Sequence, residues 1–503
     1  MISRRILILS ILLILAGAHL IFYAGWTHDD PFITFRYVQN VAAGEGFVFN
    51  AAERVEGYSN FLFLLLLLPV EWIGAGLLGA ARLYGLLFAL GTLLIFFSFL
   101  VKNYPDMRWH RFLAAGLLAL SGDAALWAVS GMETAVSLFF VTAGWIFFCR
   151  ETRSEQKIFP WSALFLLGAA LNRPEGGICF FALLAFSLAT GKRPRRFLLW
   201  ILLFLAPFAL YNGWRLLYFG RLFPNTFYAK ATGGLGIQIR AGTIYLLEFL
   251  ERNPYLLLFA LFLPFLLKKK ITPERGSAAF LVFAQALFIL VCGGDWMPLG
   301  RFMTPVLAPL FFLFQEGLFD SLEGLKSRGT RDPAFKKRDL LGLACLVLVI
   351  LSLVREARET RPIMYSLETG TLYRPHIEIG LWLRENVPPG SLLAGEEAGI
   401  IPYYSRLPFL DLLGIVDPHI ASREGPMHEK HDVSYVLSRR PDYVLLATVN
   451  SCEEEAPLRP LVASGHALMS SPRFLEIYTP VRSFPHGNPL LGKDYRTLFT
   501  RKP

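Results

Sequence analysis

Cysteine is scarce in this 503-residue chain, which has five. Four of them lie in or beside apolar runs, and Cys452 is the one cysteine after residue 355. The region after residue 355 therefore cannot form a disulfide of its own, and no cysteine and histidine spacing typical of a zinc site is present. The chain also lacks an internal repeat, which argues against a transporter built from inverted repeats.

Charged residues are also few, at 17% of the chain, whereas 54% of the residues are hydrophobic and the mean hydropathy is +0.46. A soluble globular protein rarely has this composition. Apolar runs of membrane-spanning length recur from residue 6 to residue 354, and the composition after residue 355 is ordinary. The sequence therefore predicts a membrane domain over 1–354 and a soluble domain over 355–503.

The hydropathy pattern predicts a multispan α-helical membrane protein with about eleven crossings. The stretch 61–75 is apolar but ends in Pro69, Glu71 and Trp72, which favours an interfacial helix over a span. The first run would also fit a signal peptide, but the many spans that follow make a retained span simpler. The expected spans are 6–25, 82–101, 111–129, 133–149, 160–172, 177–190, 197–218, 254–267, 277–292, 303–319 and 340–354.

Lys and Arg gather in alternate short loops, which places the N-terminus inside and the C-terminal domain outside the cytoplasmic membrane. This placement accounts for the net charge of +10, so we expect no nucleic-acid binding. After residue 355, the runs Ser391 to Ala394 and Tyr443 to Ala447 are expected to be strands, and Ile377 to Asn386 a helix. The tail is therefore predicted to be a small extracytoplasmic α/β domain.

A dense polar cluster follows the first apolar run and opens with adjacent carboxylates, Asp29 and Asp30. Asp30-Pro31 is a typical helix start, in which Asp30 would cap and Gly44 and Gly46 would end a helix lying in the interface. Asp29 has no such structural role to fill. We therefore expect Asp29 to act as the general base toward a sugar hydroxyl, with Asp30 supporting it or binding a metal.

Other outward loops carry groups suited to phosphate or sugar. Arg173, Lys230 and Arg301 are candidate phosphate ligands, although cations that face lipid headgroups would have the same pattern. Trp296 would stack on a sugar or anchor the interface, and Asp295 would join the acidic pair if a divalent cation (Mg, Mn or Ca) is the cofactor. Candidate sugar- or acceptor-binding residues are Arg54, Glu56, Tyr58, Asn60, Glu133, Asn225, Asp295 and Trp296, although residues 53–60 would also fit a self-paired surface loop.

In the tail, Asp411 and Asp417 flank the sequence LLGIV, and His428 and His431 follow with HxxH spacing. No third ligand accompanies these histidines, so structural or acceptor-contacting roles for Asp411, His428 and His431 are favoured over zinc.

The motifs resemble a known family. The run DDPFITFRYVQNVAAGEGFVFNAAERVEGYSNFL is similar to the first outer loop of the terminal β-(1→2)-arabinofuranosyltransferases, and the likeness continues through GMET, NRPEGG, PNTFYAKA and GGDWMPLGRFMTP. It extends into the tail with DLLGIVDPHIA and HEKHDVSYVLSRRPDYVLL. The resemblance implies a GT-C glycosyltransferase that uses a polyprenyl-phosphate-linked sugar.

By that resemblance, Asp29 and Asp30 match the acidic pair of the family, and Asn172 through Gly176 match a TRPEG-like turn with Asn where Thr is common. The implied acceptor is a cell-envelope glycan at the outer face of the cytoplasmic membrane, and arabinose is not fixed as the sugar. Arg173 and Lys230 would steady the departing phosphate. Alternatives are a same-fold enzyme that glycosylates a lipid or protein, a lipid-linked sugar flippase, and a non-catalytic scaffold.

Overall fold

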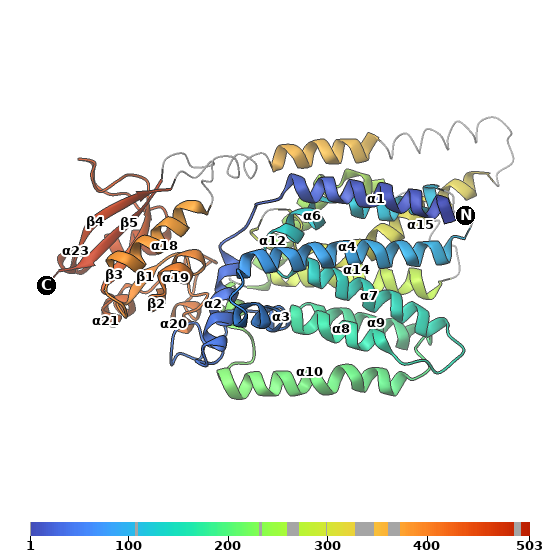
Figure 1. Cartoon of the computed structure of the whole chain (residues 1–503), viewed down its shortest axis with the longest axis horizontal. Coiled ribbons are helices and arrows are strands. Elements are labelled where there is room, and N and C mark those ends of the chain that lie inside the picture. Colours follow the sequence, from blue (N-terminus) through green and yellow to red (C-terminus); the bar gives the residue numbers. More distant parts are fainter. Residues whose placement is uncertain are drawn as a thin grey trace. The chain divides into compact units, whose positions relative to one another are not determined.

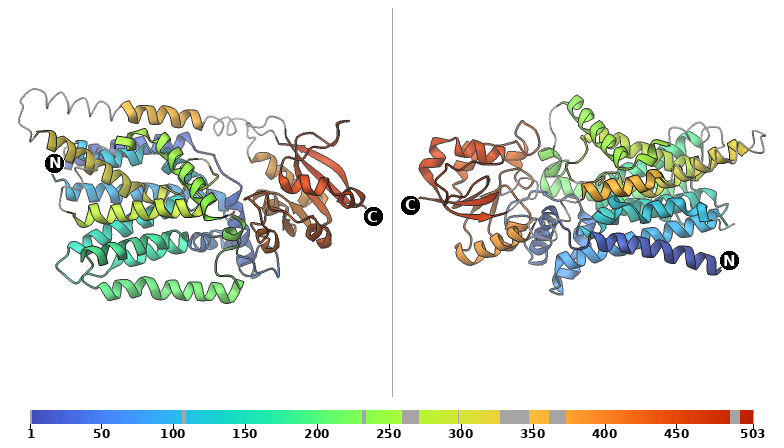
Figure 2. Two further views of the ribbon diagram at one scale, coloured as in Figure 1. Left: turned by 180° about the vertical axis from the view of Figure 1, so that it is seen from behind. Right: turned by 90° about the horizontal axis from the view of Figure 1, so that it is seen from above.

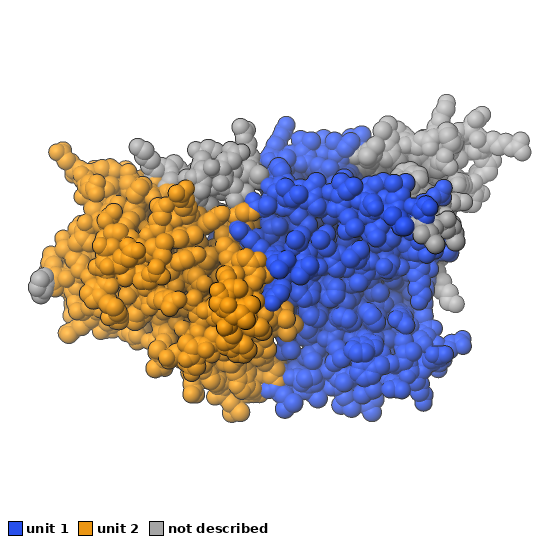
Figure 3. Space-filling view, viewed as in Figure 1, with its two compact units in different colours: residues 1–24, 82–210, 235–360 blue, residues 25–81, 211–234, 361–503 orange. Residues whose placement is uncertain are grey.

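The computed structural model describes residues 2–105, 109–230, 234–258, 271–297, 299–326, 347–360, 373–486 and 494–502 (Figure 1). The chain forms two compact units, shown in separate colours in Figure 3. Unit 1 comprises Met1–Ala24, Arg82–Leu210 and Leu235–Thr360; unit 2 comprises Gly25–Ala81, Tyr211–Gly234 and Arg361–Pro503. The single boundary expected between residues 354 and 355 therefore differs from the division observed. The segments Gly25–Ala81 and Tyr211–Gly234 fold with the C-terminal segment.

Unit 1 is a bundle of helices, several of which run side by side in all three views (Figures 1 and 2). Helices α4 and α10 each continue into unit 2, and residues 347–359 are also helical. The helices are α1 (Ile2–Phe22), α4 (Leu77–Asn103), α5 (Leu113–Ala119), α6 (Gly122–Val129), α7 (Thr134–Arg153), α8 (Trp161–Asn172), α9 (Gly176–Thr190), α10 (Phe197–Phe219), α12 (Leu235–Arg252), α14 (Pro273–Cys292) and α15 (Leu307–Lys326), with 3-10 turns η1 (Trp109–Phe112), η2 (Pro254–Leu258) and η3 (Thr304–Val306).

Within the described residues, five helices are long and apolar enough to cross a membrane. They are α1 over Ser3–Phe22, α4, α7, α10 and α14, and α3, α8 and α9 are shorter apolar helices. Helix α3 (Phe61–Trp72) covers most of the stretch expected at the interface. The total of eleven crossings stays a prediction, because the expected span 254–267 lies outside the described residues from position 259 and 340–354 lies outside them up to 346.

One expected span is broken. The run 111–129 is not continuous: α5 ends at Ala119 and α6 begins at Gly122. Ser121 adopts an extended conformation, and its side chain accepts the Ala124 N–H at 3.3 Å, which caps α6. Hydropathy did not reveal the break, because it sums apolar side chains without regard to capping groups. The amphipathic helix α12 was also missed.

Indole N–H groups buried in unit 1 are paired between helices. Trp145 of α7 donates to the Ser277 hydroxyl of α14 at 3.0 Å, and Trp200 of α10 donates to the Ser162 hydroxyl of α8 at 2.8 Å. A buried polar group is costly unless it is bonded, so each pair fixes the register of two neighbouring helices.

Unit 2 is built on a five-stranded sheet with strand order β2-β1-β3-β5-β4. Strand β1 is parallel to β2 and β3, whereas β5 is antiparallel to β3 and β4. The strands are β1 (Leu393–Gly395), β2 (Phe409–Asp411), β3 (Tyr443–Thr448), β4 (Tyr478–Pro485) and β5 (Tyr495–Arg501). The helices are α2 (Asp30–Ala42), α3, α11 (Asn225–Lys230), α18 (Arg374–Asn386), α19 (Ile400–Ser405), α20 (Pro418–Ala421), α21 (Val433–Arg439), α22 (Ala463–Met469) and α23 (Pro472–Ile477).

The α/β character expected of the tail is confirmed. Strand β3 matches the expected run within one residue, β1 begins two residues later than expected, and α18 begins three residues earlier. Strands β2, β4 and β5 were missed. Strand β2 has three residues, and its parallel partner β1 is supplied from elsewhere in the chain, so little local pattern marked it.

Helix α2 is tied to the C-terminal segment through Arg36. Its guanidinium donates to the carbonyls of Phe49, Pro402 and Leu407, each at 2.8 Å, and to the Asn50 side chain at 3.1 Å. Residues 31–38 are all buried. The backbone of the C-terminal segment thus provides acceptors for the polar side of α2. The expected position of α2 in the membrane interface stays a prediction.

Asn50 makes a second tie at the edge of the sheet. Its amide donates to the Phe409 carbonyl at 2.7 Å, and its oxygen accepts the Phe409 N–H at 3.0 Å. A single side chain thus satisfies both backbone groups of one residue of β2. This pairing covers the edge of the sheet without an added strand.

We expect Arg36→Met to lower the free energy of unfolding by about 2–4 kcal/mol, because it leaves buried carbonyls without their charged donor. Thermal unfolding of the protein in detergent would measure this loss. The control is Arg439→Met, which breaks the half-exposed pair with Glu53 and should cost less than about 1 kcal/mol. Equal effects of the two substitutions would contradict the role given to Arg36.

Candidate functional site

Asp29 has a structural partner that its sequence position did not suggest. Its carboxylate accepts the Gly399 N–H at 2.8 Å and the Ile400 N–H at 2.7 Å, one on each oxygen. These are the first amides of α19, so Asp29 caps a helix 370 residues away in the chain. Burial raises the pKa of Asp29, and the Ile400 amide opposes that rise.

Asp30 begins α2, and the capping role expected of it is not the one observed. Asp29 occupies the N-cap position of α2, and no side-chain cap bond is made there. The Asp30 carboxylate lies 3.5 Å from Nδ1 of His28, whose ring also faces the Asp30 amide. With its side chain 31% exposed, Asp30 is accessible to a substrate as well as to its histidine neighbour.

Lys230 and Asp30 both lie in the electrostatic environment of His428. Burial and the positive charge of Lys230 lower the pKa of His428, and the negative charge of Asp30 opposes them. His428 also has a positive φ of 68°, which is unusual for a residue with a side chain. The structure thus gathers a carboxylate, two imidazoles and an ammonium from three separate segments of unit 2. We refer to His28, Asp30, Lys230 and His428 as the acid–base cluster.

A network of charged side chains in the C-terminal segment acts on Asp29. Glu397 pairs with Arg496 at 2.6 Å and with His376 at 3.2 Å. Arg496 also binds Asp494 at 2.9 Å. Although burial alone would raise it, Arg496 and His376 hold the pKa of Glu397 well below its ordinary value. Since His376 and Glu397 also act on Asp29, this network sets the electrostatic surroundings of the acidic pair.

In unit 1, the predicted phosphate ligand Arg173 is held between two carboxylates. Its Nη1 lies 2.5 Å from Glu133, and its Nε donates to Glu175. All three side chains are buried. The turn NRPEGG therefore provides its own counter-ion in Glu175, which the sequence analysis did not single out.

Arg301 is arranged in the same way. Its Nε donates to Asp295 at 2.5 Å, and its guanidinium and that of Arg173 each lie 5.3 Å from the ring centroid of Phe302. For both arginines, the partners among the described residues engage Nε and Nη1. The Nη2 group of each arginine is thus the donor that remains for a ligand, and the other bonds hold each guanidinium in a fixed orientation. Arg173 with Glu133 and Arg301 with Asp295 therefore lie around one aromatic ring in unit 1, whereas Lys230, the third predicted phosphate ligand, belongs to unit 2.

Several residues predicted to bind sugar have structural contacts instead. Glu56 forms a buried two-point ion pair with Arg215 of α10, at 2.8 and 2.5 Å. The Asn60 amide oxygen accepts the Thr34 hydroxyl at 3.1 Å. Arg54 lies over the ring of Tyr218 at 4.7 Å. The alternative of a self-paired surface loop does not describe these contacts, because each partner comes from outside residues 53–60.

Tyr58 and Asn225 are also buried in unit 2. The Tyr58 hydroxyl has no hydrogen-bond partner among the described residues. Asn225 donates to the carbonyls of Gly414 and Ile415 at 2.8 and 3.0 Å, and its N–H donates to the Glu56 carbonyl at 2.8 Å. Through these contacts, Asn225 links the loop that contains Glu56 to the loop that contains Gly414 and Ile415, so its amide nitrogen already has partners within the protein.

The predicted tail residues close loops. Asp411 accepts the N–H groups of Leu413 and Val416 at 2.9 and 2.8 Å, and burial raises its pKa to about 6. His431 is exposed, and its Nδ1 lies 2.7 Å from the Glu429 carbonyl. His428 is the one residue of this group that reaches the acid–base cluster, so the HxxH spacing does not bring its two histidines into one site.

Trp296 is 48% exposed, which fits either sugar stacking or interfacial anchoring. Among the described residues, no three His, Cys, Asp or Glu side chains are grouped so that they could hold a metal ion. Asp295 belongs to unit 1 and the acidic pair to unit 2, and the divalent cation stays a prediction.

The sequence analysis missed His28, Glu175, Arg215 and the Glu397 network. His28 directly precedes the acidic pair, and Glu175 lies in a motif already singled out, so both carried a local signal. No local sequence signal marked Arg215 or Arg496, because the partners Glu56 and Glu397 are distant in sequence.

Solved structures of another protein share this fold over nearly the whole chain. A solved structure of ArnT from Cupriavidus metallidurans bound to undecaprenyl phosphate aligns with a TM-score of 0.54 and 13% identity, covering 98% of this chain and 97% of that one. The apo form aligns with a TM-score of 0.50 and 15% identity over the same shares. The predicted GT-C-like helical fold with a C-terminal α/β domain is confirmed, and the chain is a multi-pass membrane protein.

The sequence relatives agree with the resemblance drawn from the motifs. A terminal β-(1→2)-arabinofuranosyltransferase of Mycobacterium tuberculosis is 30% identical over 333 residues, which cover 57% of this chain and 51% of the relative. The protein of the same name from Corynebacterium glutamicum is 30% identical over 151 residues, covering 28% of this chain and 21% of the relative. The chain thus spans about half or less of the length of these relatives. Residues 364–499 match a domain of unknown function (DUF8728).

We expect the stability of the protein to fall as the pH rises from about 4.5 to about 7 because of Glu396. Its carboxyl accepts the Ala447 N–H at 2.9 Å and the Ser464 hydroxyl at 2.6 Å, and burial raises its pKa from 4.5 to about 7. The folded chain therefore holds a proton that the unfolded chain releases in this window, an effect of about 3 kcal/mol at most.

Glu396→Gln should flatten that dependence, since glutamine resembles the protonated acid. Thermal unfolding at pH 5 and pH 8 measures it, with the exposed Glu476→Gln as the matched control. An unchanged pH dependence in Glu396→Gln would show that other groups cause it.

Proposed function

We propose that this chain is a membrane glycosyltransferase that moves a sugar from a polyprenyl-phosphate donor to a cell-envelope glycan at the outer face of the cytoplasmic membrane. The observation that carries the proposal is the partly exposed carboxylate of Asp30, which lies 3.5 Å from Nδ1 of His28. The charges of Asp30 and Lys230 both act on His428, the fourth member of the acid–base cluster. The ArnT-like fold and the arabinofuranosyltransferase relatives support the class of reaction. They also make arabinofuranose the first sugar to test.

In the proposed step, Asp30 takes the proton of the acceptor hydroxyl as that oxygen attacks the anomeric carbon of the donor. The bond from the anomeric carbon to the phosphate oxygen breaks, and the polyprenyl phosphate leaves with the electron pair. Asp30 suits this role because it is partly exposed, whereas each Asp29 oxygen already accepts an amide of α19. Asp29 positions the segment that presents Asp30.

The leaving phosphate needs cations where its charge develops. Arg173, Arg301 and Lys230 are the proposed ligands. The two arginines are held by buried carboxylates, so their geometry is fixed before the donor binds. A lipid-linked donor also explains a site on a membrane protein, because the lipid can stay in the bilayer while the sugar remains in water. The proposal also has the C-terminal domain outside the cell, together with the other segments of unit 2.

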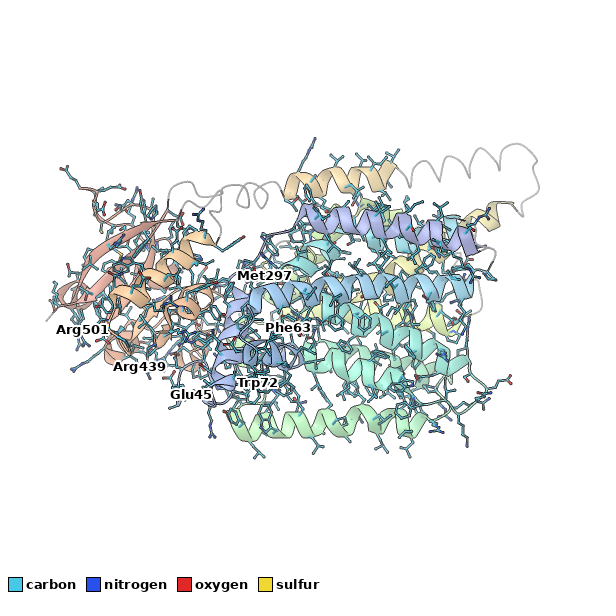
Figure 4. All side chains as sticks on the ribbon, viewed as in Figure 1. Glu45, Phe63, Trp72, Met297, Arg439 and Arg501 are labelled. Atoms are coloured by element: carbon cyan, nitrogen blue, oxygen red, sulfur yellow. The ribbon has the colours of Figure 1, made fainter. Side chains whose placement is uncertain are left out.

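We expect Asp30→Asn to lower turnover at least about 100-fold, as the loss of a general base does, with an unchanged melting temperature. Asp29→Asn should lower the melting temperature, because an asparagine cannot accept both α19 amides, and should retain part of the turnover. The assay follows transfer from polyprenyl-phosphate-linked arabinofuranose and hexoses by purified protein in nanodiscs. Glu45→Gln, an exposed carboxylate of the same loop that Figure 4 labels, is the control.

The opposite pattern, with turnover lost in Asp29→Asn at full stability and kept in Asp30→Asn, would assign the base to Asp29. Full turnover in both variants would remove the acidic pair from the chemistry. A parallel assay with EDTA, followed by Mg²⁺, Mn²⁺ or Ca²⁺, tests the predicted cation, because a metal-dependent enzyme would lose and then regain transfer.

Arg301→Lys should raise the KM for the donor about tenfold while the KM for the acceptor is unchanged, because lysine keeps the charge but lacks the planar fork. Initial rates at varied donor concentration measure the change. The control is Arg153→Lys, whose 53% exposed side chain pairs with Glu274 at the far end of α7. A lowered melting temperature with an unchanged donor KM would assign Arg301 a structural role alone.

A further inference from the structure

Unit 2 contains a cavity of about 380 Å³ that none of the chemistry above uses. It lies where the C-terminal half of α2 meets the end of α3 and the end of α19. Its size falls within the range of small-molecule sites, about 300–1,000 Å³. The side chains that line it and matter here are Gln39, Glu71, Trp72, Tyr403 and Arg406.

The cavity is separate from the acid–base cluster. Gln39 follows Asp30 by nine residues on the same helix, which corresponds to roughly 13 Å at 1.5 Å per residue. Helix α19 also separates the two places. Asp29 binds the amides at its start, and Arg406, which borders the cavity, follows its last residue. A ligand that reached both places would therefore have to be longer than one sugar.

The lining offers hydrogen-bond donors and acceptors from two guanidinium groups, one carboxylate and one amide: Arg36, Arg406, Glu71 and Gln39. Arg406 lies close enough to Glu71 to stabilise its negative charge. The guanidinium of Arg36, which also borders the cavity, is already bound to backbone carbonyls and Asn50. Among the described residues, the side chains of Gln39 and Arg406 have no hydrogen bond or ion pair within the protein. With the donors of Arg36 already used, the amide of Gln39, the carboxylate of Glu71 and the guanidinium of Arg406 remain for a ligand. This mixture of donors and acceptors suits hydroxyl groups better than an anion.

Trp72 adds a flat apolar surface beside these polar groups. It is 66% exposed, and its position on α3 is labelled in Figure 4. Interfacial anchoring explains an exposed tryptophan at the end of an apolar helix, but not why it borders a polar cavity. An aromatic ring next to amide, carboxylate and guanidinium groups matches a sugar ring, which is apolar on one face and hydroxylated around its edge.

We propose that this cavity is a carbohydrate subsite that binds the acceptor glycan several sugars away from the hydroxyl that reacts. Trp72 stacks on a sugar ring, and Gln39, Glu71 and Arg406 bind its hydroxyl groups. The identity of the glycan as the acceptor rests on the proposed function. The binding of a sugar in this cavity does not depend on it. It follows that long acceptors bind more tightly than short ones, and that the difference depends on Trp72.

Direct binding to the full chain in detergent tests this subsite without requiring turnover. The probes are a linear arabinofuranosyl hexasaccharide and the matching disaccharide, with maltohexaose as a different glycan. Trp72→Ala should weaken hexasaccharide binding at least tenfold and Glu71→Gln about fivefold, while disaccharide binding changes less than twofold. The matched control is Trp161→Ala, because Trp161 is 51% exposed at the start of α8 and lies outside the cavity. It should leave both affinities unchanged.

Hexasaccharide binding that survives Trp72→Ala would overturn the subsite, as would wild-type protein that binds neither hexasaccharide. Equal losses for hexasaccharide and disaccharide would also overturn it, because the substitution would then act on the whole fold. Competition by glycerol phosphate would assign the cavity to a lipid headgroup instead. If no donor supports transfer but hexasaccharide binding still depends on Trp72, the subsite stands and the proposed reaction fails.

Discussion

The carboxylate of Asp29 joins the first outer loop to the C-terminal domain by binding the free amides at the start of α19. A buried helix terminus needs such partners, and a charged acceptor stabilises it more strongly than a neutral one. The other unusual features of unit 2 depend on this attachment. Arg36 and Asn50 bind backbone groups of the same C-terminal segment, and Asp30 gains its place beside His28 because its neighbour is fixed.

Charge is handled differently in unit 1. Arg173 and Arg301 are buried, and each is paired with carboxylates that are also buried. Leaving either partner alone would cost several kcal/mol, on the order of 3–5, so the ions form a set that must be kept together. Such a set holds its guanidinium groups rigid, which is the property a phosphate-binding site needs before its ligand arrives.

Each unit thus has its own set of charged groups. Unit 2 holds the acid–base cluster and a polar cavity, and unit 1 holds paired, oriented arginines. The similarity to ArnT extends over nearly the whole chain, whereas the identity to the arabinofuranosyltransferases is confined to about half of it. The fold is therefore shared with proteins of very different sequence.

The sequence by itself determined the membrane character, the α/β tail, most long helices and the motifs that contain the charged clusters. These properties are local: hydropathy and turn residues act over one helix or one loop. The tertiary structure decided which role each polar residue has. Asp29 caps α19, Glu56 pairs with Arg215, and His428 rather than His431 reaches the acidic pair. Each outcome depends on a hydrogen bond or charge supplied by a segment far away in the chain, and spacing along the sequence does not specify such a partner.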